Sequence, residues 1–210
     1  MMIGIIDWIY PRICVGCGRE EEYICKDCQK KLAKPEGICP MCCKPSLDGW
    51  THARCRNRAG MERLIVGLPY RGLVQDCLKK VKYKSAWEIV SFLFGLVKWE
   101  MGEGIITSVP MWREKERGRG FNQAKILAEL MGNNVDLLER VRETKAQYGL
   151  NKEERAENIK NSFRVISNNQ ISKRLILVDD VWTTGSTMRE CTKVLKRVGA
   201  GEVWGLTLAR

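Results

Sequence analysis

Acidic and hydroxyl residues lie side by side in the segment LILVDDVWTTGST (175–187). An apolar run leads into Asp179 and Asp180, and the segment then continues through Thr183, Thr184, Gly185, Ser186 and Thr187. Short hydroxyl side chains and a glycine at the beginning of a helix can hold a phosphate through O–H and N–H donors. No lysine follows Gly185, so this is not a Walker A loop, and the pattern favours a phosphate monoester held by neutral donors.

The two carboxylates need a separate explanation, because a carboxylate repels a phosphate. We expect Asp179 and Asp180 to face sugar hydroxyls, a Mg²⁺ ion or a developing positive charge. The alternative is an Asp pair that caps the following helix.

Cysteine is the second residue type with a chemical pattern, and eight of the ten cysteines lie in the first 55 residues. CVGC (14–17) and CKDC (25–28) have the spacing of two zinc knuckles, and CPMC (39–42) and HARC (52–55) have the spacing of two more. Such clusters bind metal more often than they form disulfides in a reducing compartment. The predicted ligands are Cys14, Cys17, Cys25 and Cys28 for one site, and Cys39, Cys42, His52 and Cys55 for the other.

Four protein ligands leave no open position for water, so both zinc ions are expected to be structural. We pair the knuckles in chain order, although a cross-braced pairing uses the same ligands. Cys43 is left over and is the alternative to Cys42 as a ligand. Metal binding is expected to supply much of the folding energy of so short a segment.

The chain has 210 residues and a net charge of +11, which favours an anionic partner, either a nucleic acid or a phosphorylated small molecule. A solvated basic surface is the alternative. No apolar window reaches the roughly 20 residues that span a bilayer, and the first residues do not have the pattern of a signal peptide. The run MMIGIIDWIY is expected to form one or two helical turns. We therefore expect a soluble cytoplasmic protein without a membrane span.

Alternating strand and helix patterns predict an α/β fold, with a parallel sheet flanked by helices, in residues 61–210, after a cysteine-rich domain at 1–60. The expected strands are 63–70, 104–110, 137–142, 163–166, 175–180 and 202–209, and the expected helices are 74–83, 86–101, 121–132 and 186–200. Residues 143–162 are expected to be a mobile loop that leads into a helix. Because ligands bind at the carboxyl ends of parallel strands, the segment after residue 178 is expected to form the site.

Two family resemblances follow from these segments. LILVDDVWTTGST resembles the phosphoribosyl-pyrophosphate (PRPP) motif of type I phosphoribosyltransferases. The cysteine-rich ribbon, SVPMWREKERGRGFNQA (108–124) and TKAQYGLNKEERAENIKNSF (144–163) resemble the ComF family. Trp182 departs from the transferase motif, which more often has a smaller residue there. It is expected to pack against the sheet or to flank the ligand.

The resemblance implies roles for individual residues. Asp179 and Asp180 would be catalytic and hold the ribose hydroxyls, directly or through Mg²⁺, while residues 183–187 would cradle the 5′-phosphate. The loop after SVP would meet the pyrophosphate, with Arg113, Lys115, Arg117 and Arg119 as the available cations. Residues 143–160 would form a loop that closes over the site, and this loop carries Lys145, Gln147, Lys152, Arg155 and Asn158.

Three functions are compatible with these features. The chain could be a phosphoribosyltransferase, a glycosyltransferase whose acceptor the sequence does not identify. It could be a DNA-uptake factor of natural transformation that handles single-stranded DNA with other competence proteins, and whose PRPP site is regulatory. It could also be a zinc-ribbon nucleic-acid binder with a degenerate domain, but the complete set of acids and hydroxyls argues against degeneracy. The pocket is therefore expected to bind PRPP, or a nucleotide 5′-phosphate, with Mg²⁺. The basic stretch LKKVKYK (78–84) could contact DNA or be a solvated helix end.

Overall fold

The structure is a computed structural model that describes residues 12–20, 22–80, 86–132, 134–144, 151–167, 171 and 174–210. Three expectations lie wholly or partly outside the described residues: the helical turns at the N-terminal end, positions 81–84 of the basic stretch, and Lys145 and Gln147 of the closing loop. Within the described residues, no helix is both long enough and apolar enough to cross a membrane.

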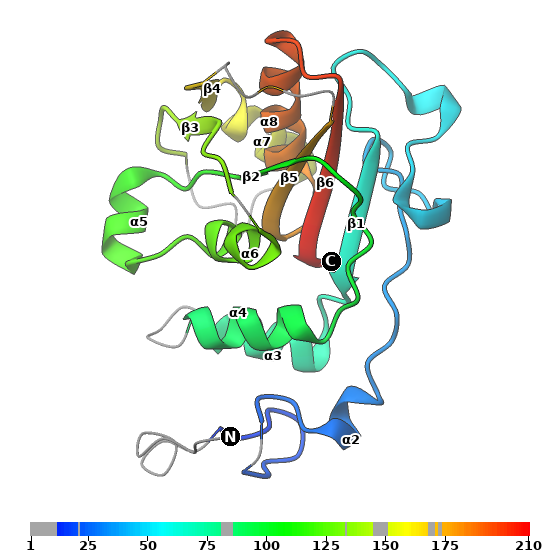
Figure 1. Ribbon diagram of the computed structural model, residues 1–210, viewed down its shortest axis with the longest axis vertical. Helices are drawn as coiled ribbons and strands as arrows, with labels where there is room; N and C mark the ends of the chain where they lie inside the picture. Colours follow the sequence, from blue (N-terminus) through cyan, green and yellow to red (C-terminus); the bar gives the residue numbers. More distant parts are fainter. Residues whose placement is uncertain are drawn as a thin grey trace.

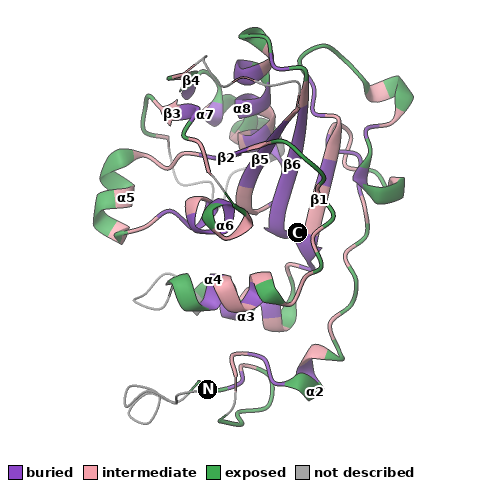
Figure 2. Ribbon diagram, viewed as in Figure 1, coloured by how far each residue is buried: buried purple, intermediate pink, exposed green. Residues whose placement is uncertain are grey.

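A four-stranded parallel sheet forms the centre of the fold, in the order β1-β6-β5-β2 (Figure 1). Its strands are β1 (Arg63–Leu68), β2 (Ile105–Ser108), β5 (Arg174–Val181) and β6 (Glu202–Ala209). Along β5 successive side chains point to opposite faces, so Leu175 and Leu177 enter one buried cluster while Ile176 and Val178 enter the other. The apolar run of β5 is thus explained by burial on both faces, which appears in purple in Figure 2.

Helices cover both faces of this sheet, which confirms the α/β fold. The cluster of Ile176 and Val178 also contains residues of α3 (Gly72–Lys80), α4 (Ala86–Gly95) and α6 (Gln123–Met131). The cluster of Leu175 and Leu177 contains residues of α7 (Lys152–Ile159) and α8 (Ser186–Arg197). The apolar spacing that predicted α3, α4, α6 and α8 therefore marks the faces that they bury against the sheet.

The structure corrects three details of the expected elements. The helix expected over 86–101 ends at Gly95, where the chain turns so that the Trp99 ring stacks on Phe94 at 5.5 Å. The segment after SVP is not a loop throughout, because Arg113–Arg119 form helix α5. The short strands β3 (Leu138–Arg140) and β4 (Phe163–Val165) do not join the main sheet but pair antiparallel with each other.

The cysteine-rich segment divides into two halves that lie at different places on the sheet domain (Figure 1). The first half, residues 12–34 with the short helix α2 (Lys26–Gln29), packs Cys14, Ile24 and Cys28 into the cluster of α3 and α4. The second half, residues 36–60 with the 3-10 turns η1 (Leu47–Gly49) and η2 (Ala53–Cys55), runs beside β1. Its Ile38 belongs to the other cluster, together with α8.

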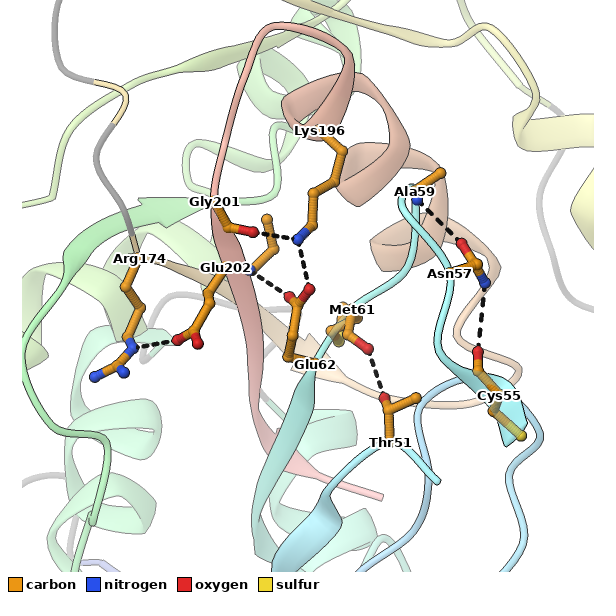
Figure 3. A network of polar contacts seen from close by, with 11 residues as sticks. Thr51, Cys55, Asn57, Ala59, Met61, Glu62, Arg174, Lys196, Gly201 and Glu202 are labelled. Carbon is orange, nitrogen blue, oxygen red and sulfur yellow. Dashed lines mark hydrogen bonds and ion pairs between the residues drawn. The ribbon is translucent and has the colours of Figure 1, made fainter. Parts of the chain in front are cut away.

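Polar contacts attach the second half to the sheet where β1 and β6 begin (Figure 3). The hydroxyl of Thr51 donates to the carbonyl of Met61 at 2.5 Å. Glu62 then accepts from the Lys196 ammonium at 2.5 Å and from the backbone N–H of Val203 at 2.7 Å. The Lys196 side chain is only 7% exposed, so this ion pair is shielded from water. These contacts join the second half, α8 and β6 into one unit.

Candidate functional site

A cavity of about 330 Å³ opens at the carboxyl ends of the parallel strands. Its walls come from segments that directly follow β1, β2 and β5, with further residues from α5, α6 and β3. This is the place where open α/β sheets bind their ligands. The residues of the expected PRPP motif that line it are Asp179, Asp180, Thr183, Thr184, Gly185, Ser186 and Thr187.

The two acids lie within β5, which continues to Val181, one residue beyond the expected end. Each half-buried carboxylate accepts the next backbone N–H: that of Asp180 binds Asp179 Oδ1 at 2.9 Å, and that of Val181 binds Asp180 Oδ1 at 2.7 Å. The N-cap of α8 is Gly185, and no side chain caps that helix. The acids therefore do not cap the following helix, and their remaining oxygens are available to the cavity.

The acid pair has unusual electrostatics. Burial raises the pKa of Asp179 well above its ordinary value, and the neighbouring charge of Asp180 raises it further. The guanidinium of Arg140 acts in the opposite direction but does not offset the two larger effects. Two adjacent carboxylates with so little compensation form an oxygen donor set for a hard cation such as Mg²⁺, or for the hydroxyls of a sugar.

The hydroxyl-rich loop between β5 and α8 has the geometry of an anion cradle. Gly185 has a φ of +74°, a conformation that glycine adopts without strain, and α8 begins at the next residue. The Thr184 and Ser186 hydroxyls are 2.8 Å apart, so they form a continuous set of polar groups above the helix N-terminus. The amide N–H groups of the first turn of α8 and its positive dipole end favour an anion at this position.

Trp182 lies beneath the cradle and is only 3% exposed. A Cβ atom at Gly185 would lie 2.1 Å from Trp182 Cζ2, so no other residue fits at 185 while this ring stays in place. The glycine is thus required by the tryptophan below it as well as by the turn. The large residue at 182 supports the hydroxyl-rich loop from the inside.

The structure brings two of the four expected cations to the cavity. Lys115 and Arg119 of α5 line it, and Arg119 also donates to the Gln123 side chain at 2.8 Å. Arg113 instead pairs with Glu139 at 3.4 Å and lines a neighbouring cavity, while Arg117 is exposed and lines neither. The helical spacing of α5 causes this division, because residues four apart share a face of a helix.

Arg140 is a cavity residue that the sequence pattern did not single out. Its guanidinium lies 5.7 Å from the Phe163 ring centre, and burial lowers its pKa. Its buried Nε has no hydrogen-bond partner among the described residues. A single arginine in a three-residue strand has no sequence signal, and only the antiparallel pairing of β3 and β4 places it beside Asp179.

Asn122 of the RGFNQ element connects two backbone segments beside the cavity. Its side chain caps α6 by accepting the Ala124 N–H at 3.0 Å, and it donates to the Val109 carbonyl at 3.0 Å. These two bonds fix the beginning of α6 to the segment that follows β2.

Arg155 of α7 contacts the cradle. It donates to the Thr183 hydroxyl at 3.3 Å, so the helix after residues 145–150 reaches the hydroxyl-rich loop.

The first half brings Cys14, Cys17, Cys25 and Cys28 together, with every pair of sulfur atoms within 4.8 Å. The Cys17 and Cys25 sulfurs are 3.6 Å apart, close to the roughly 3.8 Å edge of a tetrahedron with Zn–S bonds of about 2.3 Å. Burial acts to raise the pKa of Cys14, but N–H donors of Cys25, Gly16 and Cys17 lower it to about 6. These donors are the knuckle N–H groups that stabilise a thiolate ligand.

The second half brings Cys39, Cys42, His52 and Cys55 together within the same limit, and Cys43 lies outside the group. The imidazole Nε2 lies 3.0 Å from the Pro45 carbonyl, which can only accept a hydrogen bond. The other nitrogen, Nδ1, is therefore free to bind a metal, and it faces the Cys42 sulfur at 3.4 Å. The knuckles pair in chain order, and both donor sets fit structural zinc.

The fold and its sites define an α/β protein with a double zinc ribbon and a polar cavity at the carboxyl ends of its parallel strands. In agreement, a family model described as the double zinc ribbon domain matches residues 5–57. The chain is 30% identical over 205 residues to the DNA utilization protein YhgH of Escherichia coli K12, covering 87% of this chain and 89% of that protein. It is 28% identical over 204 residues to the competence protein ComFC of Streptococcus pneumoniae, covering 91% and 89% of the two chains. Competence protein F of Haemophilus influenzae is 39% identical over 114 residues, half of each chain. The chain belongs to the ComF family.

Proposed function

We propose that the cavity binds PRPP, or a nucleotide 5′-phosphate, together with Mg²⁺. One observation supports the proposal most directly: groups that bind anions and groups that bind cations line the same cavity of about 330 Å³. Hydroxyls and a helix N-terminus form one side, and two carboxylates with little nearby positive charge form the other. The cradle would hold the 5′-phosphate, and Asp179 and Asp180 would hold the ribose hydroxyls and the magnesium ion. All residues of the proposed pocket lie within residues 61–210, the larger of the two predicted domains.

The same arrangement suits phosphoribosyl transfer to an acceptor. Cleavage of the bond between ribose C1 and pyrophosphate leaves positive charge on the sugar and negative charge on the leaving group. The carboxylates of Asp179 and Asp180 stabilise the first charge, and the side chains of Lys115, Arg119 and Arg140 stabilise the second. Mg²⁺, when bound, adds positive charge near the pyrophosphate oxygens.

Calorimetry with PRPP and Mg²⁺ tests the binding proposal directly. Asp179→Asn combined with Asp180→Asn should weaken binding by at least about 100-fold, because hydrogen bonds to charged groups contribute about 1.5–3 kcal/mol each. Asp76→Asn, an exposed acid on α3, is the matched control and should bind as the parent does. Parent protein that does not bind, or a double variant that binds equally well, would refute the pocket assignment.

Release of pyrophosphate separates a transferase from a regulatory PRPP site. The purified protein is incubated with PRPP, Mg²⁺ and each of a panel of nucleobases, and released pyrophosphate is measured. Release that depends on one acceptor, and that disappears in the Asp179→Asn, Asp180→Asn variant, identifies the transferase. Binding without release identifies a regulatory site.

We also propose that the chain acts in the uptake or use of DNA and contacts single-stranded DNA. The names of its relatives and the net charge of +11 support this second activity. On the surface of the second half, Trp50 is 38% exposed and the Arg63 guanidinium lies 5.2 Å from its ring centre. An aromatic face beside a cation is the kind of group on which single-stranded bases stack.

Salt dependence tests the DNA proposal. If phosphate contacts dominate, the affinity for an oligonucleotide should fall steeply as salt rises from 50 to 200 mM. An affinity that is independent of salt would contradict it. A transformation assay with the Asp179→Asn, Asp180→Asn variant then asks whether DNA uptake needs the pocket.

A further inference from the structure

Arg189 in the first turns of α8 contacts both the phosphate cradle and the second zinc site. Its Nη1 donates to the Thr184 carbonyl at 2.8 Å, and its guanidinium lies 5.3 Å from the centre of the Trp182 ring. On the other side, its Nε donates to the Pro40 carbonyl at 2.6 Å and its Nη2 contacts the Cys43 sulfur at 2.9 Å. One planar side chain thus joins Thr184 to Pro40 and Cys43, which lie more than 140 residues earlier in the sequence.

The groups that Arg189 contacts on the ribbon belong to a turn that the metal organises. Pro40 lies between the predicted ligands Cys39 and Cys42, and Cys43 follows Cys42 directly. The turn is closed by two backbone bonds, from the Cys43 N–H to the Cys39 carbonyl and from the Cys39 N–H to the Lys44 carbonyl, both at 2.9 Å. Cys43 also has a φ of +60°, which a non-glycine residue adopts only where its surroundings hold it. Metal ligation is the strongest constraint available to so short a turn.

The groups that Arg189 contacts on the other side set the shape of the cradle. The Thr184 hydroxyl is one of the cradle donors, so its backbone position determines where that donor points. The Trp182 ring fills the space directly below Gly185. A shift of the guanidinium would therefore move a donor of the phosphate loop and the ring that supports the loop.

We propose that Arg189 couples the second zinc site to the phosphate cradle, so that metal at Cys39, Cys42, His52 and Cys55 shapes the loop that holds the ligand's phosphate. The proposal rests on the proposed function of the pocket and adds a regulator to it. Coupling of binding free energies is reciprocal, so a phosphate ligand in the cradle also strengthens zinc binding at the second site. The first zinc site lies in the cluster of α3 and α4 and provides a comparison within the same chain.

Hydrogen exchange tests the coupling without any ligand. Cys42→Ser removes one ligand from the second site, and Cys17→Ser removes one from the first, so metal analysis should show that each variant retains one zinc of two. Amides of residues 182–187 should exchange faster in Cys42→Ser than in the parent, and at the parental rate in Cys17→Ser. Equal exchange of this loop in all three proteins would overturn the proposal.

Variants of Arg189 test the connection itself. Arg189→Met should weaken PRPP–Mg²⁺ binding by about 10-fold, a typical coupling factor, and should speed the transfer of zinc from the second site to a chelator. Arg197→Met, an exposed arginine near the end of the same helix, is the matched control and should change neither. Cys43→Ala removes the sulfur contact while leaving all eight predicted ligands, and it should show a smaller effect in the same direction.

The outcomes distinguish a failure of the proposed coupling from a failure of the proposed ligand assignment. If the parent does not bind PRPP while Cys42→Ser still loosens residues 182–187, the coupling stands and the ligand assignment falls. If the parent binds PRPP and Arg189→Met binds it as tightly, with unchanged zinc transfer, the coupling falls and the ligand assignment stands.

Discussion

The two halves of the zinc ribbon have the same two-knuckle pattern but different attachments to the rest of the molecule. The first half contributes buried cysteines to the cluster of α3 and α4. The second half is attached at two places. Thr51 bonds to Met61 and Glu62, which lead into β1 and contact β6, and Arg189 connects the second half to the cradle. Two metal sites with similar knuckle spacing therefore belong to ribbon halves that contact different parts of the fold: α3 and α4 for the first half, and the sheet and the loop after β5 for the second.

Glycines provide the strongest test of this comparison, because each half contains one with a left-handed backbone. Gly49 in the second half has a φ of +74°, and a Cβ there would lie 1.9 Å from the Leu64 carbonyl oxygen of β1. Gly18 in the first half has a φ of +76° and no neighbouring atom within 4 Å of that position. Gly49→Ala should lower the free energy of unfolding by about 3–4 kcal/mol through strain and overpacking, and Gly18→Ala by about 1 kcal/mol through strain alone.

Denaturant unfolding of the two alanine variants, each with its zinc content measured, checks this prediction. Equal losses would mean that the second half is no more firmly attached to the sheet than the first.

Ion pairs give the second test. Lys196→Met removes the partner of Glu62 at a shielded position and should destabilise the protein by about 3 kcal/mol, because an unpaired carboxylate remains. Arg19→Met breaks the 3.0 Å pair with Asp27 in the first half, where the two side chains are 59% and 52% exposed. Since water screens that pair, the melting temperature should not change measurably. A large effect of Arg19→Met in thermal melts would contradict the prediction that only the shielded pair contributes measurably to stability.

The last prediction is a stabilisation at Asp179, which lies in the sheet domain and outside both ribbon halves. The pKa of Asp179 is raised by burial and by Asp180, so its ionised form opposes folding at neutral pH. That cost disappears as the pH falls below about 4, where an unfolded aspartate is also protonated. Asp179→Asn should therefore raise the melting temperature by about 2–4 °C at pH 7, the shift that about 1 kcal/mol produces in a chain of this size.

Thermal melts of the parent and Asp179→Asn at pH 7 and at pH 4 test the sign, and the difference should shrink at the lower pH. A variant that melts below the parent at pH 7 would show that Arg140 neutralises the carboxylate after all.

Local patterns in the sequence predicted much of this structure. The C-x2-C and H-x2-C spacings predicted both groups of zinc ligands, since four residues suffice to build a knuckle. The apolar run before Asp179 predicted a strand buried on both faces, and the alternation of patterns predicted the α/β fold. These features depend on neighbours in the chain, which the sequence displays directly.

Features that depend on distant neighbours were not predictable in the same way. Arg140 reaches the cavity through a pairing of β3 with β4 that no local pattern specifies. The α5 helix is only seven residues long and so charged that it resembled a loop. The different attachments of the two ribbon halves, and the side chain of Arg189 between them, depend on contacts across most of the chain.

The strand order has a consequence for how the chain folds during synthesis. Among the described strands of the sheet, β1 is hydrogen-bonded to β6 alone, and more than 130 residues separate the two strands. The ribosome therefore completes both ribbon halves long before the strand that covers β1 exists. The first half meets α3 and α4 soon after they emerge, but the second half must wait for α8 and β6 with an open strand edge beside it. That interval is when the growing chain is most exposed to aggregation.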